Sequence, residues 1–339
     1  MKKALYLLFT VIFIGCDSSI KEPAVPNQPA PTPTPQPTPE PTPAPPECEE
    51  QSSNLFSCTW VQADMSNLER EFYFYLPAND SNQKPSVLIA LHGGGGTSAS
   101  MKNKTRFNEL KDEKNFITVY PQGDETETGL ARWQRRQPCV VGKVCDTAFL
   151  EHIIDYLIFN HDADYEQIHV AGHSNGGFMS YFLACNLSNS IASISVVAGS
   201  MDFNTYDNCN SIHPMPVLHI HGLDDATIDP LGSNSYRSTE DVVMFWSEFN
   251  SCQTQEQIPG SDVNGDGNSW LLNQYSDCLN GVKVDFYSHE GGSAHAWPIY
   301  RSDFNNGDID ASTVIIDFIQ MFDINGIKTS EMSLEKNAN

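Results

Sequence analysis

The chain is short of basic residues: 19 lysines and arginines stand against 43 aspartates and glutamates, a formal net charge of −24. This imbalance argues against nucleic acids and anionic membrane surfaces as partners. A zinc-type cluster is also lacking, since no CxxC pair and no Cys/His group at zinc spacing occurs. The glycine run at 93–96 is not followed by Lys-Ser/Thr, so it is not a P-loop. No cofactor is expected.

An apolar run long enough to span a bilayer is missing as well. Residues 1–16, MKKALYLLFTVIFIGC, carry two lysines and then a short apolar stretch, which is typical of an export signal. The end of this stretch, Phe13-Ile14-Gly15-Cys16, resembles the lipobox of bacterial lipoproteins, whose cysteine is lipidated and becomes the mature N-terminus. The alternative is an ordinary signal peptide with a chance cysteine. We expect an exported lipoprotein in the periplasm or at the cell surface, attached to the membrane through Cys16 alone.

Large apolar residues are absent from the segment that follows. Almost every second residue of 21–47 is proline, so residues 17–47 cannot be buried in a core and are expected to form a disordered, extended stalk. Residues 48–325 are long enough for one catalytic α/β domain, and 326–339 read as a polar tail.

The nine cysteines form an odd number, which is unusual in an exported protein unless one is used otherwise. If Cys16 carries the lipid, eight remain for disulfides in an oxidising compartment. A preference for short loops predicts four pairs: Cys48–Cys58, Cys139–Cys145, Cys185–Cys209 and Cys252–Cys278. Each closure would stabilise the fold by roughly 2–4 kcal/mol.

Strand-like and helix-like segments alternate along 48–325, which predicts a mainly parallel sheet covered by helices. An outer strand is expected at 70–76. Short segments rich in β-branched residues predict further strands at 86–91, 116–120, 168–171, 194–198, 217–221 and 282–287. Helical patterns lie at 149–159, 178–185, 240–249 and 312–322.

The segment Gly172-His173-Ser174-Asn175-Gly176 contains the pattern G-x-S-x-G. It follows a strand-like segment and precedes a helix-like one, which is the setting that a nucleophile elbow needs. The two outer glycines let strand and helix pass closely, and Ser174 then projects at a helix N-terminus. Ser174 is the candidate nucleophile, against the alternative of an idle serine in a glycine-rich turn.

Acyl transfer develops negative charge on the carbonyl oxygen, which two backbone N–H groups must meet. One is expected from Asn175, directly after the nucleophile. The other is expected from the glycine run that follows the strand at 86–91, with Gly94 and Gly95 as candidates.

An acid and a histidine complete the predicted triad. Asp225 follows the strand at 217–221 and is favoured over its neighbours Asp224 and Asp229. His295 lies in a loop after the strand at 282–287 and completes the order Ser, Asp, His of α/β hydrolases. The histidines at 173, 219 and 221 come too early in that order and are expected to pack or hold loops.

These motifs resemble those of extracellular polyhydroxybutyrate depolymerases and of the feruloyl and acetylxylan esterases of carbohydrate esterase family 1. The shared segments are ALHGGGGT, VYPQG, AGHSNGGFMS, HIHGLDD and GGSAHAWP, spread over residues 68–322. The resemblance implies an α/β-hydrolase fold and the same three triad residues. It places Trp133 and Trp297 near a substrate groove, where His173 is also expected. It further supports Cys185–Cys209 and Cys252–Cys278.

Two departures from the family pattern leave the substrate open. The acid motif continues with Ile228-Asp229 in place of Val-Pro, and Gly-Gly-Ser-Ala-His stands in place of Gly-Gly-Gly-His. We expect carboxylic-ester hydrolysis through an acyl-enzyme, acting on a polymer or a large ester. The alternatives are a serine peptidase on the same fold and a catalytically silent, polymer-binding lipoprotein.

One acidic segment stands apart from these motifs. Asp262, Asn264 and Asp266 alternate as in the start of a calcium loop, but Asn273 occupies the position of the usual bidentate Glu. The segment is either a polar turn or a calcium site.

Overall fold

The computed structural model describes residues 45–62, 68–78, 83–291, 294–301 and 303–329. Contacts divide the chain into residues 1–42 and 43–339, and all described residues belong to the second unit. The expected signal, Cys16 and nearly all of the expected stalk lie outside the described residues. Within the described ranges, eleven strands form one sheet in the order β1-β2-β3-β5-β4-β6-β7-β8-β11-β10-β9.

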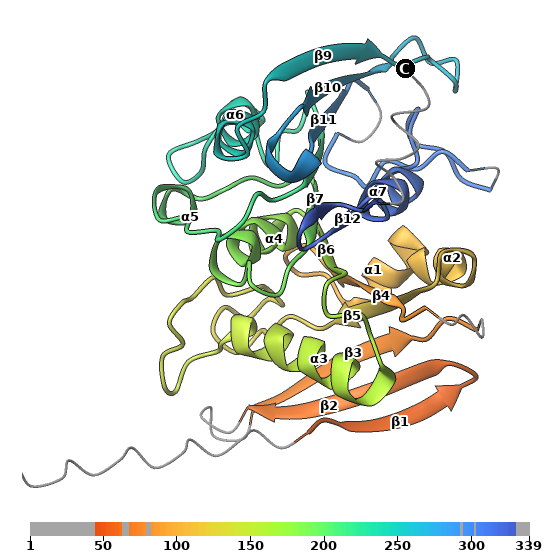
Figure 1. Cartoon of the computed structure of the whole chain (residues 1–339), viewed down its shortest axis with the longest axis vertical. Helices are drawn as coiled ribbons and strands as arrows, with labels where there is room; N and C mark the ends of the chain where they lie inside the picture. The colour runs from red at the N-terminus through yellow and green to blue at the C-terminus, as the bar shows by residue number, and fades with distance from the viewer. Residues whose placement is uncertain (1–44, 63–67, 79–82, 292–293, 302, 330–339) are drawn as a thin grey trace, which may run out of the picture. The chain divides into compact units, whose positions relative to one another are not determined.

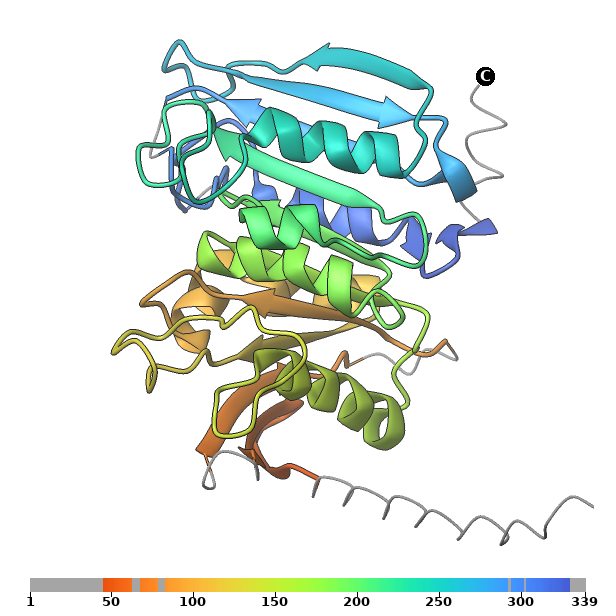
Figure 2. The same cartoon turned by 90° about the vertical axis from the view of Figure 1, so that its left-hand side faces the viewer.

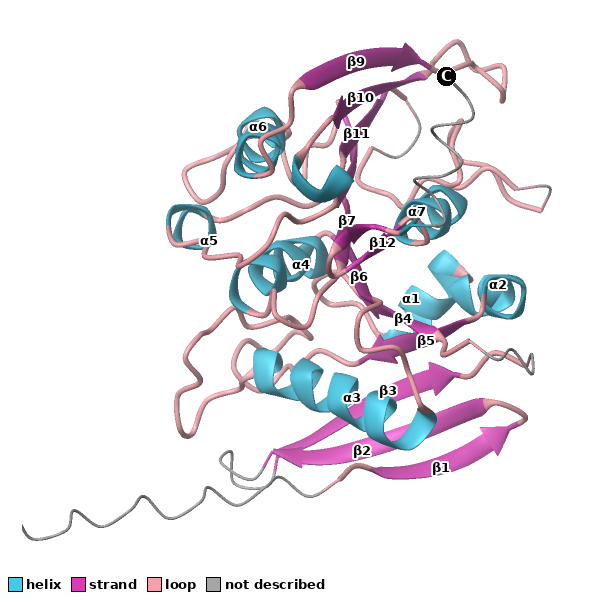
Figure 3. Ribbon diagram, viewed as in Figure 1, coloured by secondary structure: helices cyan, strands magenta, loops and turns pink. Residues whose placement is uncertain are grey.

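The centre of this sheet is parallel, as expected from the sequence. Six adjacent strands run in the same direction: β5 (Phe116–Pro121), β4 (Ser86–Leu91), β6 (Ile168–His173), β7 (Ser193–Val197), β8 (Val217–Gly222) and β11 (Val284–His289). Every residue of β5, β6, β7 and β8 is buried, because helices cover both faces of the sheet (Figure 3). Strands buried on both faces form continuous apolar runs, so the sequence pattern reveals them.

Both edges of the sheet are antiparallel, and the sequence predicted only one of their strands. One edge consists of β1 (Glu47–Ser52), β2 (Leu55–Gln62) and β3 (Leu68–Tyr75), and the other of β10 (Trp270–Ser276) and β9 (Thr254–Pro259). The β9 segment TQEQIP is almost wholly exposed. An edge strand without an apolar face carries no period-two signal, which explains why it was missed.

Helices lie on both faces of the sheet (Figures 1 and 2). One face carries α3 (Asp146–His161), α4 (Asn175–Asn186), α5 (Phe203–Asp207) and α6 (Thr239–Phe249). The other face carries α1 (Ser98–Thr105), α2 (Phe107–Lys114) and α7 (Ala311–Ile319). A short 3₁₀ turn, η2, covers Leu279–Gly281.

The end of the body differs from the sequence prediction. The helix expected over 312–322 ends at Ile319, and Phe322 belongs to the two-residue strand β12 (Phe322–Asp323). This strand pairs with β13 (Gly326–Ile327), which takes two residues from the segment expected to be a tail. Gly326 has φ +118°, a conformation that residues with a Cβ rarely adopt, and this permits the tight return.

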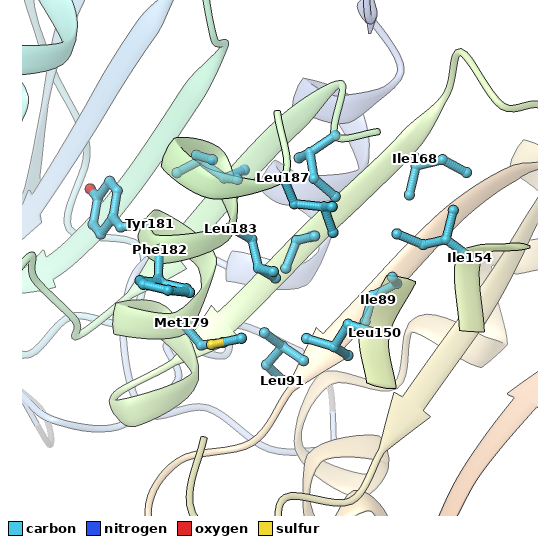
Figure 4. Packing of buried hydrophobic residues seen from close by; sticks show 14 of the residues in the cluster. Ile89, Leu91, Leu150, Ile154, Ile168, Met179, Tyr181, Phe182, Leu183 and Leu187 are labelled. Carbon is cyan, nitrogen blue, oxygen red and sulfur yellow. The ribbon is translucent and has the colours of Figure 1, made fainter. Parts of the chain in front are cut away.

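The helix that follows the nucleophile strand is buried on nearly all sides. Figure 4 shows its side chains packed among residues of β4, β6 and α3. Met179, Leu183 and Leu187 contribute to this cluster from the helix side, and Ile89 and Leu91 from the sheet side. Dense packing of this kind resists displacement, so the N-terminus of α4 is a rigid support for Ser174.

Four disulfides are present, and they are the four predicted pairs: Cys48–Cys58, Cys139–Cys145, Cys185–Cys209 and Cys252–Cys278. The first joins residues that face each other across β1 and β2. The last two tie the ends of α4 and α6 to later segments. Among the described residues, no helix has the length and apolar character needed to cross a bilayer.

Candidate active site

The candidate site lies where the parallel strands end. The glycine run follows β4, Ser174 follows β6, Asp225 comes shortly after β8, and His295 lies in the loop after β11. Because carboxyl ends of adjacent parallel strands meet at one edge of a sheet, segments that are more than a hundred residues apart converge there.

Ser174 occupies a strained turn between β6 and α4. Its backbone has φ +54° and ψ −118°, which residues with a Cβ rarely adopt. A Cβ on Gly172 would overlap the carbonyl of Gly176, and a Cβ on Gly176 would overlap the carbonyl of Leu91. The two glycines of G-x-S-x-G are therefore required by the close passage of strand and helix, as the sequence predicted.

The structure brings the three predicted triad residues into one chain of hydrogen bonds. His295 Nε2 lies 3.0 Å from Ser174 Oγ, and His295 Nδ1 lies 2.7 Å from Asp225 Oδ2. Since the carboxylate can only accept, Nδ1 carries a proton and Nε2 is free to accept the hydroxyl proton of Ser174. This arrangement can activate a serine for attack on a carbonyl carbon.

The carboxyl of Asp225 is buried and fully hydrogen-bonded. Its Oδ1 accepts the backbone N–H groups of Thr227 at 2.8 Å and Ile228 at 3.0 Å. Burial alone would raise the pKa of Asp225, but the hydrogen bonds from histidine side chains and these N–H groups outweigh it and hold the pKa well below its usual range. Of the three acids considered from the sequence, it is Asp225 that contacts His295.

A chain of buried side chains continues behind this carboxyl, and sequence reasoning missed it. His221 Nε2 lies 3.3 Å from Asp225 Oδ2 and 2.8 Å from the carbonyl of Ile228. His219 Nε2 lies 3.0 Å from His221 Nδ1, and the Tyr181 hydroxyl lies 2.6 Å from His219 Nδ1.

The chemistry of the end groups sets the direction of this chain. Because Asp225 and the Ile228 carbonyl only accept, His221 donates from Nε2, and in the neutral form of the ring Nδ1 is the acceptor. His219 then donates from Nε2, and the Tyr181 hydroxyl donates to it. Burial lowers the pKa of His219 well below its ordinary value, which agrees with a neutral ring. The motif HIHGLDD predicted histidines that hold a loop. Tyr181 is distant in the sequence, and no local pattern predicts its hydrogen bond to His219.

The structure separates the two glycines proposed for the oxyanion site. The N–H of Gly95 donates to the carbonyl of Ala131 at 2.7 Å, so it is already engaged within the protein. Among the described residues, no hydrogen bond engages the N–H of Gly94. Asn175 is the first residue of α4, where backbone N–H groups have no partner within the helix. Gly94 and Asn175 are therefore the candidates for the two oxyanion donors.

Trp133 supports the glycine run from inside the protein. The ring is 2% exposed, its Nε1 donates to the carbonyl of His92 at 2.8 Å, and its backbone N–H donates to Asn175 Oδ1 at 2.8 Å. His92 Nε2 in turn accepts the N–H of Gly123, from the VYPQG segment. Trp133 is thus buried beside the predicted groove, where it holds together the two segments that carry the candidate oxyanion donors.

Trp297 is also placed away from the groove surface. It is 1% exposed and its Nε1 donates to Ser312 Oγ at 3.1 Å, which ties the His295 loop to α7. Its polar atom is already hydrogen-bonded inside the protein, so Trp297 supports the His295 loop from within.

His173 does lie at the cavity beside Ser174, as expected. Its Nδ1 accepts from Lys104 Nζ at 3.2 Å, and its Nε2 donates to the backbone carbonyl of His295 at 2.8 Å. Burial and the Lys104 ammonium lower the pKa of His173 to about 3, so the ring is neutral. His173 thereby holds the loop that carries the candidate base.

The cavity has a volume of about 240 Å³. Its described lining consists of glycine backbone, three histidines, two serines, a methionine and a lysine: His92–Gly96, Ser100, Met101, Lys104, His173, Ser174 and His295.

The acidic segment near residue 262 forms a tight loop that does not contribute to this cavity lining. Oxygen atoms of Asp262, Asp266 and Asp308 come within 4.8 Å of one another. The two carboxylate oxygens of Asp262 accept N–H groups of 265–267, and Asp308 Oδ1 accepts those of Val263 and Asn264. Asn264 Oδ1 also accepts a backbone N–H. These oxygens stabilise a polar turn, which was one of the two interpretations of this segment.

Fold and site together define a serine hydrolase of the α/β-hydrolase type. The family model "Esterase: Putative esterase" matches residues 63–264, and the chain belongs to this family. The match includes Ser174 and Asp225 and ends before His295.

Individual relatives agree with this assignment. The chain is 23% identical to the bifunctional acetylxylan esterase/xylanase XynS20E of Neocallimastix patriciarum, over 66% of this chain and 30% of that protein. It is 28% identical to feruloyl esterase C of Emericella nidulans, over 66% of this chain and 76% of the relative. The acetyl xylan esterase from Aspergillus awamori shares the fold, with a TM-score of 0.54 and 15% identity, over 72% of this chain and 95% of that one.

Coverage limits what can be carried over from these proteins. The chain spans about a third of the length of several curated relatives, for example 30% of the Neocallimastix protein and 39% of feruloyl esterase B of Piromyces equi. The expected α/β-hydrolase fold and esterase family are nevertheless confirmed.

Proposed function

We propose that this protein hydrolyses carboxylic esters through an acyl-enzyme formed on Ser174. The observation that carries the proposal is the continuous chain from Ser174 Oγ through His295 to Asp225, built on a strained elbow. Membership of the Esterase family supports the same reaction class.

The geometry assigns a step to each group. His295 Nε2 takes the hydroxyl proton as Ser174 Oγ attacks the ester carbonyl, and Asp225 stabilises the imidazolium that forms. Negative charge on the carbonyl oxygen is met by the N–H groups of Gly94 and Asn175. His295 then protonates the leaving alcohol, and water attacks the acyl-enzyme by the reverse sequence to release the acid.

The proposed substrate is a polymer or another large ester outside the cytoplasm. Acetylxylan and feruloyl esterases among the relatives favour plant cell-wall esters, and the motif resemblance adds polyhydroxybutyrate-like polyesters. A hydrolysis panel of polyhydroxybutyrate, methyl ferulate and acetylated xylan separates these classes, with the largest kcat/KM marking the natural one.

Removal of the nucleophile tests the reaction itself. Ser174→Ala is expected to lower kcat on a p-nitrophenyl ester by about 10⁴–10⁶, with an unchanged melting temperature, because the hydroxyl acts only in the reaction. A matched control is Ser235→Ala, an exposed serine outside the cavity lining. Retention of more than a tenth of wild-type activity by Ser174→Ala would refute the assignment.

We further propose that the protein is exported and lipid-anchored at Cys16. The four disulfides support an oxidising compartment. Buried acyl chains contribute about 0.8 kcal/mol per CH₂, so their loss should release the protein. Cys16→Ser is therefore expected to move it from the detergent phase to the aqueous phase in phase separation. Continued partition with detergent would show that the anchor lies elsewhere.

A further inference from the structure

Two basic side chains beside the candidate oxyanion site have no acidic partner in the part of the chain that the structure describes. Most other arginines of the body are paired, as Arg70 is with Asp146, Arg135 with Asp202 and Arg301 with Asp310. Lys104 and Arg132 differ: among the described residues, no carboxylate lies within ion-pair distance of either. In a chain with a net charge of −24, an unpaired lysine in the cavity beside Ser174 and an unpaired arginine next to Gly94 call for an explanation.

Lys104 extends from α1 into the wall of the cavity that Ser174 and His295 line. Apart from the three histidines, it is the one side chain of that described wall that can carry a charge. The Nζ of Lys104 donates a hydrogen bond to His173 Nδ1 at 3.2 Å. An ammonium group carries three N–H donors, so two remain for a ligand.

Arg132 borders the glycine turn at Gly94. Its guanidinium carbon is 3.7 Å from the point where a Cβ on Gly94 would stand, and the Cβ of Asn175 is equally close to that point. The guanidinium therefore borders the two residues whose N–H groups remain as oxyanion donors. The side chain is exposed, which leaves its planar donor face open to an anion.

We propose that the natural substrate is an ester that carries a carboxylate close to the scissile bond, and that Lys104 and Arg132 bind this carboxylate. The inference rests on the proposed esterase activity and narrows its substrate class. The acidic surface of the protein repels anions at long range. At short range, charge-assisted hydrogen bonds to a carboxylate inside a partly desolvated cavity are stronger than this repulsion. Suitable compounds are half-esters of dicarboxylic acids, where the charge is on the acyl side, and acyl esters of hydroxy acids or uronates, where it is on the alcohol side.

Two matched pairs of esters test this with the purified full chain in detergent. Monomethyl and dimethyl glutarate differ by a carboxylate on the acyl side, and 4-acetoxybenzoate and its methyl ester differ by one on the alcohol side. The readout is the ratio of kcat/KM for the anionic ester to that for its neutral partner. We expect a ratio above one in at least one pair, mainly through a lower KM, and a decrease of the ratio as salt is added.

Variants then connect the preference to the two cations. Loss of a charge-assisted hydrogen bond should lower the ratio roughly 10- to 100-fold in Lys104→Met or Arg132→Met, whereas Lys104→Arg should retain most of it. Lys102→Met is the matched control, because Lys102 is on the same helix but lines a separate, tyrosine-rich pocket; it should leave the ratio unchanged.

Three results would overturn the proposal. A wild-type ratio at or below one in both pairs overturns the proposal and leaves the esterase assignment intact. An equal fall for charged and neutral esters in both Met variants also overturns it, since the cations would then serve the oxyanion of any ester. Absence of turnover of all four esters by the wild type refutes the proposed function and this inference together.

Discussion

Asp285 is a buried carboxylate whose removal should stabilise the protein at neutral pH. It lies on β11 with 6% of its surface exposed. The hydrogen bond recorded for its carboxylate comes from Gln274 Nε2 at 3.0 Å, on the neighbouring strand β10. Burial raises the pKa of Asp285 to about 6, so desolvation outweighs the favourable contacts.

The sign and size of the effect follow from linkage. In the unfolded chain the pKa of an aspartate is about 3.9. If a carboxyl has a higher pKa in the folded state, the unfolding free energy of the protein falls as the pH rises from about 4 to about 6. Above pH 6 the full destabilisation is present. The difference between a pKa of about 6 in the folded protein and about 3.9 in the unfolded chain corresponds to roughly 3 kcal/mol of stability. Asp285→Asn should recover this amount at pH 7.5 and none of it well below pH 4.

Urea unfolding with intact disulfides, followed by tryptophan fluorescence at pH 7.5 and pH 4.0, measures the effect. Any cost of an unpaired N–H in the introduced amide group is present at both pH values and cancels in the difference between them. The change in unfolding free energy should be larger at pH 7.5 by about 2–3 kcal/mol. Asp155→Asn, an exposed acid on α3, is the control. A pH-independent effect of Asp285→Asn would refute the reasoning.

Two further substitutions test the site and the core. In Asp225→Asn, Oδ1 can keep its two backbone N–H contacts only if the side-chain NH2 faces His295, and this NH2 forces the wrong tautomer of the imidazole. We therefore expect kcat on a p-nitrophenyl ester to fall about 10⁴-fold. A loss of less than tenfold contradicts the assignment. Asp146→Ala leaves the buried Arg70 guanidinium without its partner. It should lower the unfolding free energy by about 3–5 kcal/mol in thermal or urea unfolding, while an unchanged stability would show that water or another acceptor compensates.

Local patterns in the sequence were sufficient for the parts of the protein that depend on local geometry. Strands buried on both faces appear as continuous apolar runs, so the parallel centre of the sheet could be predicted. G-x-S-x-G reflects a close passage of strand and helix that only glycine permits, and so it identified the elbow at Ser174. The chain order Ser, Asp, His and the short cysteine loops similarly led to Asp225, His295 and the four disulfides.

Only the tertiary structure decided how groups distant in sequence share hydrogen bonds and charge. Gly94 and Gly95 are equivalent in the sequence, and the contact of Gly95 with Ala131 separates them. Trp133 is identified as a buried support because its indole reaches the glycine run across the fold. The direction of the chain from Tyr181 to Asp225 follows from which atoms meet at the end of β8. Hydrogen bonds and desolvation depend on positions within a few ångströms, and no local pattern records these distances.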